Sequence, residues 1–471
     1  MNHKKLLLTL TLCLCALLCM VVTASASEVS VHTNHFSCGV VGCQNNDHGH
    51  TPVTEWQPWT GPQSASEDNI PYDFNTKTAY IYLANNVEIE DALTIPKDHT
   101  LYLCLNGHDI IRTGNLIQIQ EDASFTLCDC KGDKAEYGKL DSNKGGRVVS
   151  FESGKPGTFT MYGGIITGGN ITGNSGGGVF VGDKNTFTMY GGTITGNRAR
   201  YTGGGVVVYG AFNMYGGAIT GNSAQEGGGG VAAHGTFTMY GGAITDNTCN
   251  GSYNGGGVYV KNGTWSTGAI TLSGNVQIKD NYKGSNSNKK PSNLYLTNNK
   301  EIAVESSLTG SSIGVTTATE PSTGSNVTFA VGSENTITTG IFTPDTAGVL
   351  VGVAADGTSA YLYKCSHVYN EWAYDQEYHW KKCTNVGCDS VEAGSKIAHT
   401  WDYPADYNKP KTCVCGATQG EPLTRSYYYY APSAAENRKD SPKTADPGVL
   451  LYAGLALASL TGLACTAKKR H

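Results

Sequence analysis

The sequence predicts an all-β protein built around a right-handed parallel β-helix, a solenoid in which the chain winds in stacked coils. One observation is a repeated phrase, Phe-x-Met-Tyr-Gly-Gly, whose steps along the 471-residue chain are 28, 25 and 25 residues. A second phrase, Gly-Gly-Gly-Val, recurs at nearly the same interval. Self-similarity at a fixed period indicates a solenoid, because each copy can bury its apolar face only against the next copy. The phenylalanines are Phe159, Phe187, Phe212 and Phe237, and the glycine phrases open at Gly176, Gly203, Gly228 and Gly255.

Within each copy the residues alternate with period two, which is typical of a half-buried strand and does not fit a helix. Phe and Met fall on one side, while Thr and Tyr fall on the other. We expect three short strands per coil, joined by bends at Gly and Asn, two residues that tolerate left-handed backbone. The phenylalanines should stack inside the solenoid. An Asn side-chain ladder should line one corner, formed by Asn174, Asn197, Asn222 and Asn247.

These repeats, with Leu-Cys-Leu-Asn-Gly-His at Leu103–His108 and Phe-Thr-Leu-Cys-Asp-Cys at Phe125–Cys130, resemble a known family. It comprises the Gly-rich β-helix surface proteins of Gram-positive bacteria, within the pectin-lyase-like fold superfamily. The resemblance covers roughly residues 80–281. It implies a secreted surface protein and does not imply catalysis.

The beginning of the chain predicts export. Residues 1–26 combine a basic start, an apolar run and a small-residue cleavage site ending at Ala26, which is the pattern of a secretory signal helix. We therefore expect the protein outside the cell.

The other end of the chain resembles a cell-wall sorting signal of the Leu-Pro-x-Thr-Gly type. A motif precedes an apolar stretch at 449–465, expected as a transmembrane helix, and a basic tail. The resemblance implies that a sortase cuts after Thr444 and attaches the protein to peptidoglycan. Ser441 and Ala445 depart from the usual residues, so the sortase class stays open, and a plain membrane anchor is the alternative. The motif comprises Ser441, Pro442, Lys443, Thr444 and Ala445.

Composition fits an extracellular scaffold with flanking modules. The chain has 61 Gly, 15% charged residues and a net charge of −6, and it lacks the basic stripe that nucleic-acid binding requires. We expect a Cys/His-containing N-terminal segment before the solenoid, and a small module and linker after it. The expected boundaries are 1–26 for the signal, 27–70 for the N-terminal segment, 71–358 for the solenoid, 359–419 for the Cys/His-rich module, 420–440 for the linker and 441–471 for the sorting signal.

The Cys/His-rich module predicts a structural zinc site. Histidines interleave with cysteines at short spacings, and thiolate and imidazole supply tetrahedral N/S ligands to a domain too small for a core. Disulfides and reduced structural thiols are the alternatives. The spacing cannot choose four ligands among the candidates; the preferred set is Cys383, Cys388, Cys413 and Cys415, with His367, His379 and His399 as alternates. A weaker cluster between His32 and His50 permits a metal or one disulfide.

Catalysis is not expected. β-Helix polysaccharide lyases and hydrolases use clustered acids, and glycoside hydrolysis needs two carboxylates about 5 to 9.5 Å apart. The acids of residues 151–281 do not repeat at one coil position. They are Glu152, Asp183, Glu226, Asp246 and Asp280.

One row of aromatics is expected to face outward. Tyrosine hydroxyls and rings suit glycans, so these residues, flanked by Thr160, Thr188 and Thr238, predict a binding strip for glycans or another surface ligand. The alternative is that like residues stack on themselves to stabilise the sheet. The tyrosines are Tyr162, Tyr190, Tyr215 and Tyr240. The expected function is a non-catalytic, surface-displayed adhesin, with a secreted polysaccharide lyase or hydrolase, or a structural spacer, as alternatives.

Overall fold

The computed structural model describes residues 56–62, 70–130, 137–251, 254–263, 266–284, 288–385, 388, 390–402 and 409–420. All elements assigned in these ranges are strands. No helix among the described residues is long and apolar enough to cross a membrane. The expected signal with Ala26, the cluster around His32, most of the linker, the sorting motif and the C-terminal apolar stretch lie outside the described residues.

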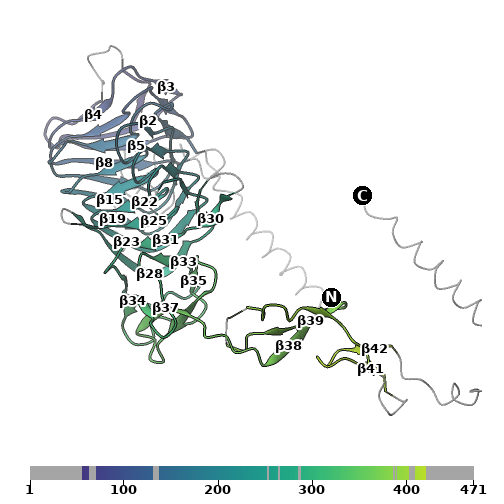
Figure 1. The fold of residues 1–471 in the computed structure, drawn as a ribbon. Coiled ribbons are helices and arrows are strands. Elements are labelled where there is room, and N and C mark those ends of the chain that lie inside the picture. Colours follow the sequence, from purple (N-terminus) through teal and green to yellow (C-terminus); the bar gives the residue numbers. More distant parts are fainter. Residues whose placement is uncertain are drawn as a thin grey trace, which may run out of the picture. The chain divides into compact units, whose positions relative to one another are not determined.

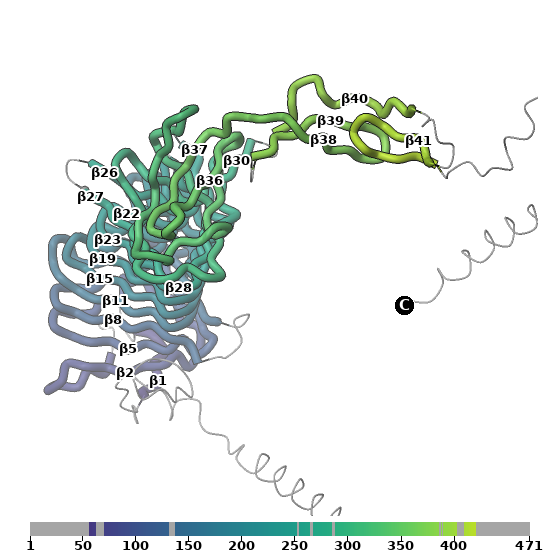
Figure 2. The backbone as a smooth tube through the Cα atoms, turned by 90° about the horizontal axis from the view of Figure 1, so that it is seen from below, coloured from purple at the N-terminus to yellow at the C-terminus, as the bar shows by residue number. Residues whose placement is uncertain are grey.

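The described strands form a long, mainly parallel sheet network of 29 strands, consistent with the predicted β-helix solenoid. Each strand pairs with the equivalent strand of the next coil, so the coils stack in chain order (Figures 1 and 2). In the repeat region one column of paired strands consists of β8 (Ala123–Cys128), β11 (Gly157–Met161), β15 (Asn185–Met189), β19 (Ala211–Met214) and β23 (Thr236–Thr245).

Two more parallel columns supply the other two strands per coil that the sequence predicts. The second contains β9 (Lys139–Asp141), β12 (Ile165–Thr167), β16 (Thr193–Thr195) and β20 (Ala218–Thr220). The third contains β10 (Val149–Phe151), β14 (Val179–Val181), β18 (Val206–Val208), β22 (Val231–Ala233), β25 (Val258–Val260) and β31 (Leu294–Leu296).

The structure adds a fourth column that the sequence does not predict. It is a run of two-residue strands in a separate sheet of six strands. Its parallel members are β13 (Asn170–Ile171), β17 (Arg198–Ala199), β21 (Ser223–Ala224), β24 (Thr248–Cys249) and β29 (Tyr282–Lys283), followed by antiparallel β30 (Lys290–Pro291). Such short strands are too brief to show an alternating pattern, which explains why sequence periodicity misses them.

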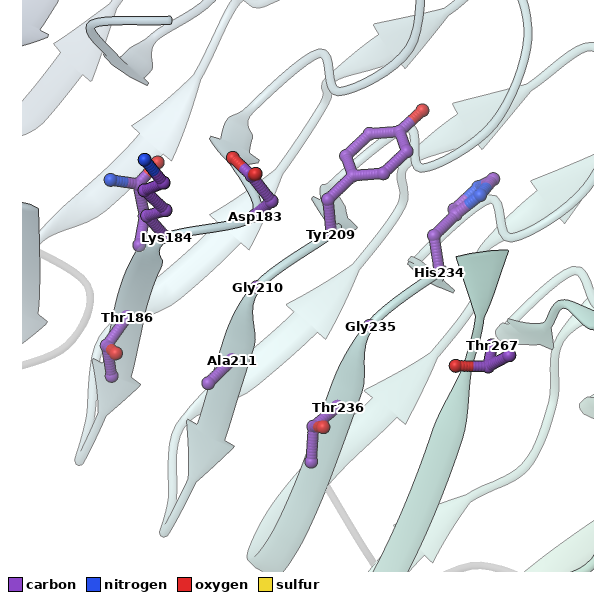
Figure 3. A pocket seen from close by; sticks show the side chains of 11 residues that line it. Asp183, Lys184, Thr186, Tyr209, Gly210, Ala211, His234, Gly235, Thr236 and Thr267 are labelled. Carbon is purple, nitrogen blue, oxygen red and sulfur yellow. The ribbon is translucent and has the colours of Figure 1, made fainter. Parts of the chain in front are cut away.

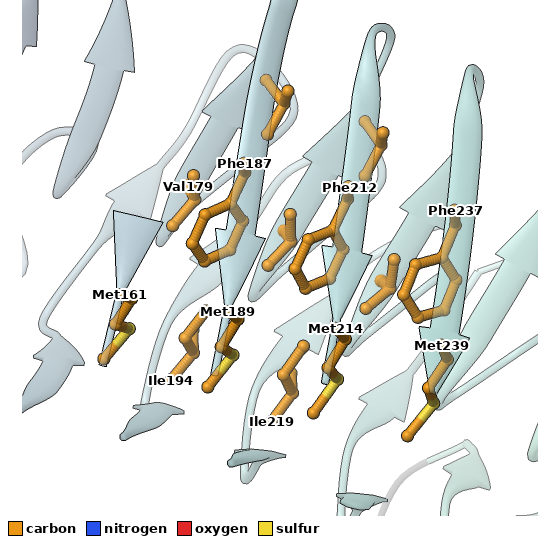
Figure 4. Packing of buried hydrophobic residues seen from close by; sticks show 14 of the residues in the cluster. Met161, Val179, Phe187, Met189, Ile194, Phe212, Met214, Ile219, Phe237 and Met239 are labelled. Atoms are coloured by element: carbon orange, nitrogen blue, oxygen red, sulfur yellow. The ribbon is translucent and has the colours of Figure 1, made fainter. Parts of the chain in front are cut away.

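The core confirms the predicted inward face. Phe159, Phe187, Phe212 and Phe237 are at most 1% exposed and stack with ring centroids 4.6 to 5.0 Å apart. Figure 4 shows the rings of Phe187, Phe212 and Phe237 and the methionines repeating from coil to coil beside valines and isoleucines of the other columns. The ring spacing matches the separation of neighbouring strands. Each coil therefore adds one phenylalanine ring to the core at the spacing of the strands.

The asparagine ladder exists, but its membership differs from the prediction. Asn197 donates to Asn222 Oδ1, Asn222 to Asn247 Oδ1, and Asn247 to Asn281 Oδ1, each at 3.0 Å. Asn281 continues the ladder to Asn293 at 3.1 Å. These side chains are buried.

Asn174 lies outside the ladder. The first coil carries the phrase twice, as Ile-Thr-Gly-Gly at 166–169 and as Ile-Thr-Gly-Asn at 171–174. Strand pairing aligns Ile166 with Ile194, so the corner position that Asn197 fills in the next coil is Gly169. Asn174 is exposed, and its Oδ1 accepts a hydrogen bond from the backbone N–H of the next residue, Ser175, at 2.8 Å. The second copy of the phrase is therefore out of register with the ladder.

The C-terminal part of the solenoid becomes irregular, as expected. Its last strands include β34 (Val327–Gly332), β36 (Val349–Val353) and β37 (Ser359–Lys364). β37 pairs antiparallel with both β34 and β36. This change from parallel to antiparallel pairing closes the sheet with a hairpin in place of another coil, and it places 359–364, the start of the expected Cys/His-rich module, within the solenoid sheet.

The rest of that module contributes to two compact units. Unit one ends at Glu371 and regains Lys382–Glu392, whereas unit two comprises Trp372–Lys381 and the chain from Ala393 onward. The remaining short strands are β38 (Glu371–Tyr374), β39 (Tyr378–Lys382), β40 (Ile397–Ala398), β41 (Lys411–Thr412) and β42 (Thr418–Gln419). Each unit carries one Cys/His group.

Candidate functional site

The first Cys/His group lies wholly within unit one. Cys365, His367, Cys383 and Cys388 bring their ligand atoms within 4.8 Å of one another. Cys365 directly follows β37, and its Sγ lies 3.5 Å from Cys383 Sγ. Cys388 Sγ lies 3.3 Å from His367 Nδ1. All three cysteines are at most 9% exposed. Three thiols and one imidazole in this arrangement could hold a metal ion.

The second group lies wholly within unit two and comprises His379, His399, Cys413 and Cys415, also within 4.8 Å of one another. Cys413 Sγ lies 3.3 Å from His379 Nδ1, and Cys415 Sγ lies 3.5 Å from His399 Nδ1. His379 projects from β39 and is 1% exposed, and its Nε2 is buried without a hydrogen-bond partner. Nδ1, the ring nitrogen that faces Cys413 Sγ, is the nitrogen that His379 offers to this group.

The structure therefore separates the four cysteines that the sequence favoured as one set. Cys383 and Cys388 join Cys365 and His367, whereas Cys413 and Cys415 join His379 and His399. The histidines chosen as alternates all become members. Sequence spacing could not show this division, because β39 carries His379 into one group and continues directly to Cys383 in the other.

Local hydrogen bonds favour thiolate at one cysteine in each group. Burial alone would raise the pKa of Cys383, but the backbone N–H groups of Asn385 and Val368 lower it to about 6. Burial likewise opposes ionisation of Cys413, whereas the Cys415 N–H and the His399 side chain lower the pKa to about 7. Cys365 behaves oppositely, since burial raises its pKa to about 11. Because metals bind thiolate, each group has at least one ligand already poised to coordinate.

The tyrosine row forms a continuous outward stack on unit one. Ring centroids are 4.9 Å apart for Tyr162 and Tyr190, 4.9 Å for Tyr190 and Tyr215, and 4.6 Å for Tyr215 and Tyr240. The planes are within 12° of parallel. Tyr190 and Tyr215 are 43% and 44% exposed. We call these four residues the tyrosine ladder.

The stacking restricts how the tyrosine ladder can meet a ligand. Each inner ring has a neighbouring ring on both faces, so a sugar cannot stack on Tyr190 or Tyr215. Tyr162 packs in addition against the buried cluster of Trp56, Cys104 and Cys128. What remains available is a row of ring edges and hydroxyl groups, spaced by the coil repeat. The tyrosine ladder is therefore suited to hydrogen bonding by its hydroxyls.

A shallow groove of about 520 Å³ opens at the other end of the same strands (Figure 3). It forms because the turns of adjacent coils differ in length. Tyr209-Gly210 and His234-Gly235 are tight turns, whereas the chain inserts Gly182–Lys184 on one side. On the other side it inserts a hairpin of β26 (Asn262–Gly263) and β27 (Ser266–Thr267). A signal for this groove was present in the sequence as unequal repeat steps.

The groove side chains are polar apart from Ala211 and Tyr209, and Tyr209 is 39% exposed. Figure 3 shows Thr186, Ala211 and Thr236 on adjacent strands below the turns. His234 lies 3.1 Å from Thr202 Oγ1 through Nε2, and burial, with the charge of Lys261, lowers its pKa to about 4. His234 is therefore neutral at physiological pH.

Only one carboxylate, Asp183, lies among the groove-lining residues. Acid–base hydrolysis of a glycoside requires two.

Cys104, Cys128 and Cys130 are buried beside Trp56, as expected for core-filling thiols.

Comparison with known proteins finds no match among protein-family models, curated proteins or solved structures. The resemblance to Gly-rich surface β-helices therefore rests on the quoted motifs.

Proposed function

We propose that this chain is a non-catalytic surface protein that binds extended glycans across the outer face of β11, β15, β19 and β23. The observation that carries the proposal is the exposed tyrosine ladder at one edge of this face. Thr160, Thr188 and Asn213 are half-buried between the tyrosine ladder and the groove and offer hydroxyl and amide groups on adjacent coils, whereas Thr238, also expected beside the tyrosines, is buried. An extended chain of hydroxyl-bearing sugars suits such a regular polar surface.

The sequence motifs supply the cellular setting of the proposal. The signal pattern and the motif at Ser441–Ala445 support export and attachment to peptidoglycan by a sortase in a Gram-positive bacterium. A mass measurement of wall-released protein tests this: cleavage after Thr444 supports attachment, whereas a chain retaining residues beyond Thr444 supports a membrane anchor.

One variant with two conservative substitutions tests glycan binding. Changing both Tyr190 and Tyr215 to Phe keeps the stacked rings but removes two hydroxyls. We expect loss of retention on a glycan array with unchanged circular dichroism. The matched control is Tyr201→Phe, because Tyr201 is 44% exposed but lies outside the tyrosine ladder. Retention by the double variant equal to wild type would contradict the hydroxyl mechanism.

Absence of any glycan binding by the wild-type chain would favour a different function. The stacking that covers the ring faces also stabilises adjacent strands, with each pair contributing about 0.2–1 kcal/mol. In that case the tyrosine ladder stiffens the solenoid, and the protein is better described as a spacer that displays other parts away from the wall.

We further propose that zinc is the ion held by the Cys/His groups. Mixed thiolate and imidazole ligands in closed four-membered sets suit Zn²⁺, whereas Ca²⁺ and Mg²⁺ prefer oxygen. An ion of this kind would cross-link its four side chains. Elemental analysis of the purified full chain tests the identity: zinc above all other transition metals is expected, and a different dominant metal would contradict it.

A further inference from the structure

We propose that the chain holds two zinc ions with separate structural tasks. The ion at Cys365, His367, Cys383 and Cys388 fastens the C-terminal end of the solenoid. The ion at His379, His399, Cys413 and Cys415 takes the place of a hydrophobic core in unit two. The inference rests on the proposed identity of the metal and extends it to the number and roles of the ions.

Ligand spacing supports a tetrahedral ion in each group. With Zn–S bonds of about 2.3 Å and Zn–N bonds of about 2.0 Å, tetrahedral geometry puts neighbouring donors about 3.5–3.8 Å apart. The Cys365 and Cys383 sulfurs are 3.5 Å apart. The separation from sulfur to Nδ1 is 3.5 Å for Cys415 and His399, and it is 3.3 Å for Cys388 with His367 and for Cys413 with His379, about 0.2 Å below the tetrahedral spacing.

A disulfide would not use these groups fully. Bonded sulfurs lie about 2.05 Å apart, and pairing two cysteines of the first group would leave the third thiol and His367 unused. Five cysteines and three histidines converge in two sets instead, and these five cysteines form no disulfide.

The first group is positioned to hold the last strand of the solenoid. Cys365 is the residue after β37, whose pairing with β34 and β36 completes the described sheet. Leu350 of β36 packs against the buried cysteines of this group. An ion here would therefore connect directly to the terminal hairpin.

The segment that supplies the other two cysteines is joined to the solenoid by few hydrogen bonds. Thr384 N and Oγ1 donate to Val368 O, and Asn385 Nδ2 donates to Ser366 O at 2.7 Å. Without an ion, little apolar contact beyond the cysteines would hold this segment. Loss of the ion would release this segment from Cys365 and from Leu350 of the terminal hairpin.

The described residues of unit two bury few apolar side chains. Among its described residues, the buried side chains are His379, Cys413 and Ala417. Two of these three are members of the second group. β38, β39 and β40 form a small three-stranded sheet, and the pairings of β39 with β40 and of β41 with β42 each cover two residues. A domain this small needs a cross-link, and metal binding then supplies the folding free energy.

Metal counting on the full chain tests the number of ions. Wild type should carry two zinc ions, and Cys388→Ser and Cys413→Ser should each carry one. The control is Cys249→Ala, since Cys249 is buried but belongs to neither group, and it should keep two. One ion in wild type, or a disulfide that peptide mapping assigns to the cysteines of the two groups, would overturn the inference. Two ions of another metal would overturn only the zinc identity.

Hydrogen exchange tests the separate roles. Cys388→Ser should lose protection at β37 amides while those of β15 and β19 keep theirs. Cys413→Ser should lose protection at β40 and β41 and retain β37. Gradual chelation of the wild-type chain gives the same information without substitution: loss of the two ions in separate steps supports two roles, and cooperative loss with simultaneous exposure of β37 and β41 would refute them.

Discussion

Asn222 provides a direct measure of what the asparagine ladder contributes. Its Nδ2 donates to Ile194 O at 2.8 Å, Thr220 O at 3.1 Å and Asn247 Oδ1 at 3.0 Å. Its Oδ1 accepts from both the backbone N and the Nδ2 of Asn197 at 3.0 Å. Replacement of Asn222 with Ala removes all five hydrogen bonds from a residue that is 1% exposed.

The expected cost follows from the groups that are stranded. The N–H of Asn197, itself 1% exposed, loses its acceptor, and a buried group left unpaired costs about 1–3 kcal/mol. Removal of the donor to Ile194 and Thr220 adds a smaller amount. We expect Asn222→Ala to destabilise the local coils by about 2–4 kcal/mol.

Asn174→Ala is the matched control, because the same four-residue phrase contains it but it lies outside the ladder. The single described hydrogen bond of its side chain is local, and its loss should change stability by about 0.5–1 kcal/mol at most. Solenoids do not necessarily unfold in one step, so amide exchange at β16 and β20 is the appropriate assay. Equal effects of the two substitutions, or an Asn222→Ala effect below about 1 kcal/mol, would refute the ladder assignment.

Three other substitutions or conditions make further predictions. Lowering the pH from 7 to 4.5 should destabilise the solenoid, because His234 has a pKa of about 4 when folded and about 6.5 when unfolded, so the unfolded chain takes up the proton first. The full loss of folding free energy from this pKa difference is about 3 kcal/mol. Denaturant titration should show a weaker pH dependence for His234→Gln than for wild type. Phe212→Ala should cost about 3–5 kcal/mol by opening a cavity in the ring stack, measured by the shift in denaturation midpoint, and a loss below about 1 kcal/mol would contradict close packing. Gly204→Ala should be strongly destabilising because the added Cβ would lie 2.3 Å from Ser223 O. Gly173→Ala, whose Cβ would have nothing within 4 Å, should leave thermal stability nearly unchanged. Comparable melting temperatures of the two variants would contradict the predicted clash at Gly204.

The tyrosine ladder shows how far sequence can predict a candidate site. Alternation within the repeated phrase places Tyr190 and Tyr215 opposite the buried Phe and Met, and both are exposed. Only the coil register and the side-chain rotamers show that the rings stack with their faces covered. That detail changes the expected contact with a sugar from stacking on a ring face to hydrogen bonding with a hydroxyl.

The groove illustrates a different limit. The turn residues Tyr209 and His234 carry no motif of their own, and their neighbours Asp183 and Thr267 belong to insertions separated by many residues. Unequal turns become a groove only when adjacent coils are stacked, because the groove forms where a coil with a short turn lies beside coils with longer turns.

The sequence by itself determined the solenoid, its period and its inward face. A phrase that recurs every 25 to 28 residues with period-two alternation allows one economical burial, in which Phe stacks on Phe and Met on Met. Local pattern suffices there because every coil contributes the same residues to the same position.

Tertiary structure decided the choices between equivalent local patterns. Asn174 and Asn197 end the same phrase, but pairing of Ile166 with Ile194 admits only Asn197 to the ladder. Cys383 and Cys413 both belong to short Cys/His patterns, but they enter different groups because β39 carries His379 to one group and the chain then returns to the other. Register and chain path are long-range properties, so residues with the same neighbours in sequence acquire different partners in space.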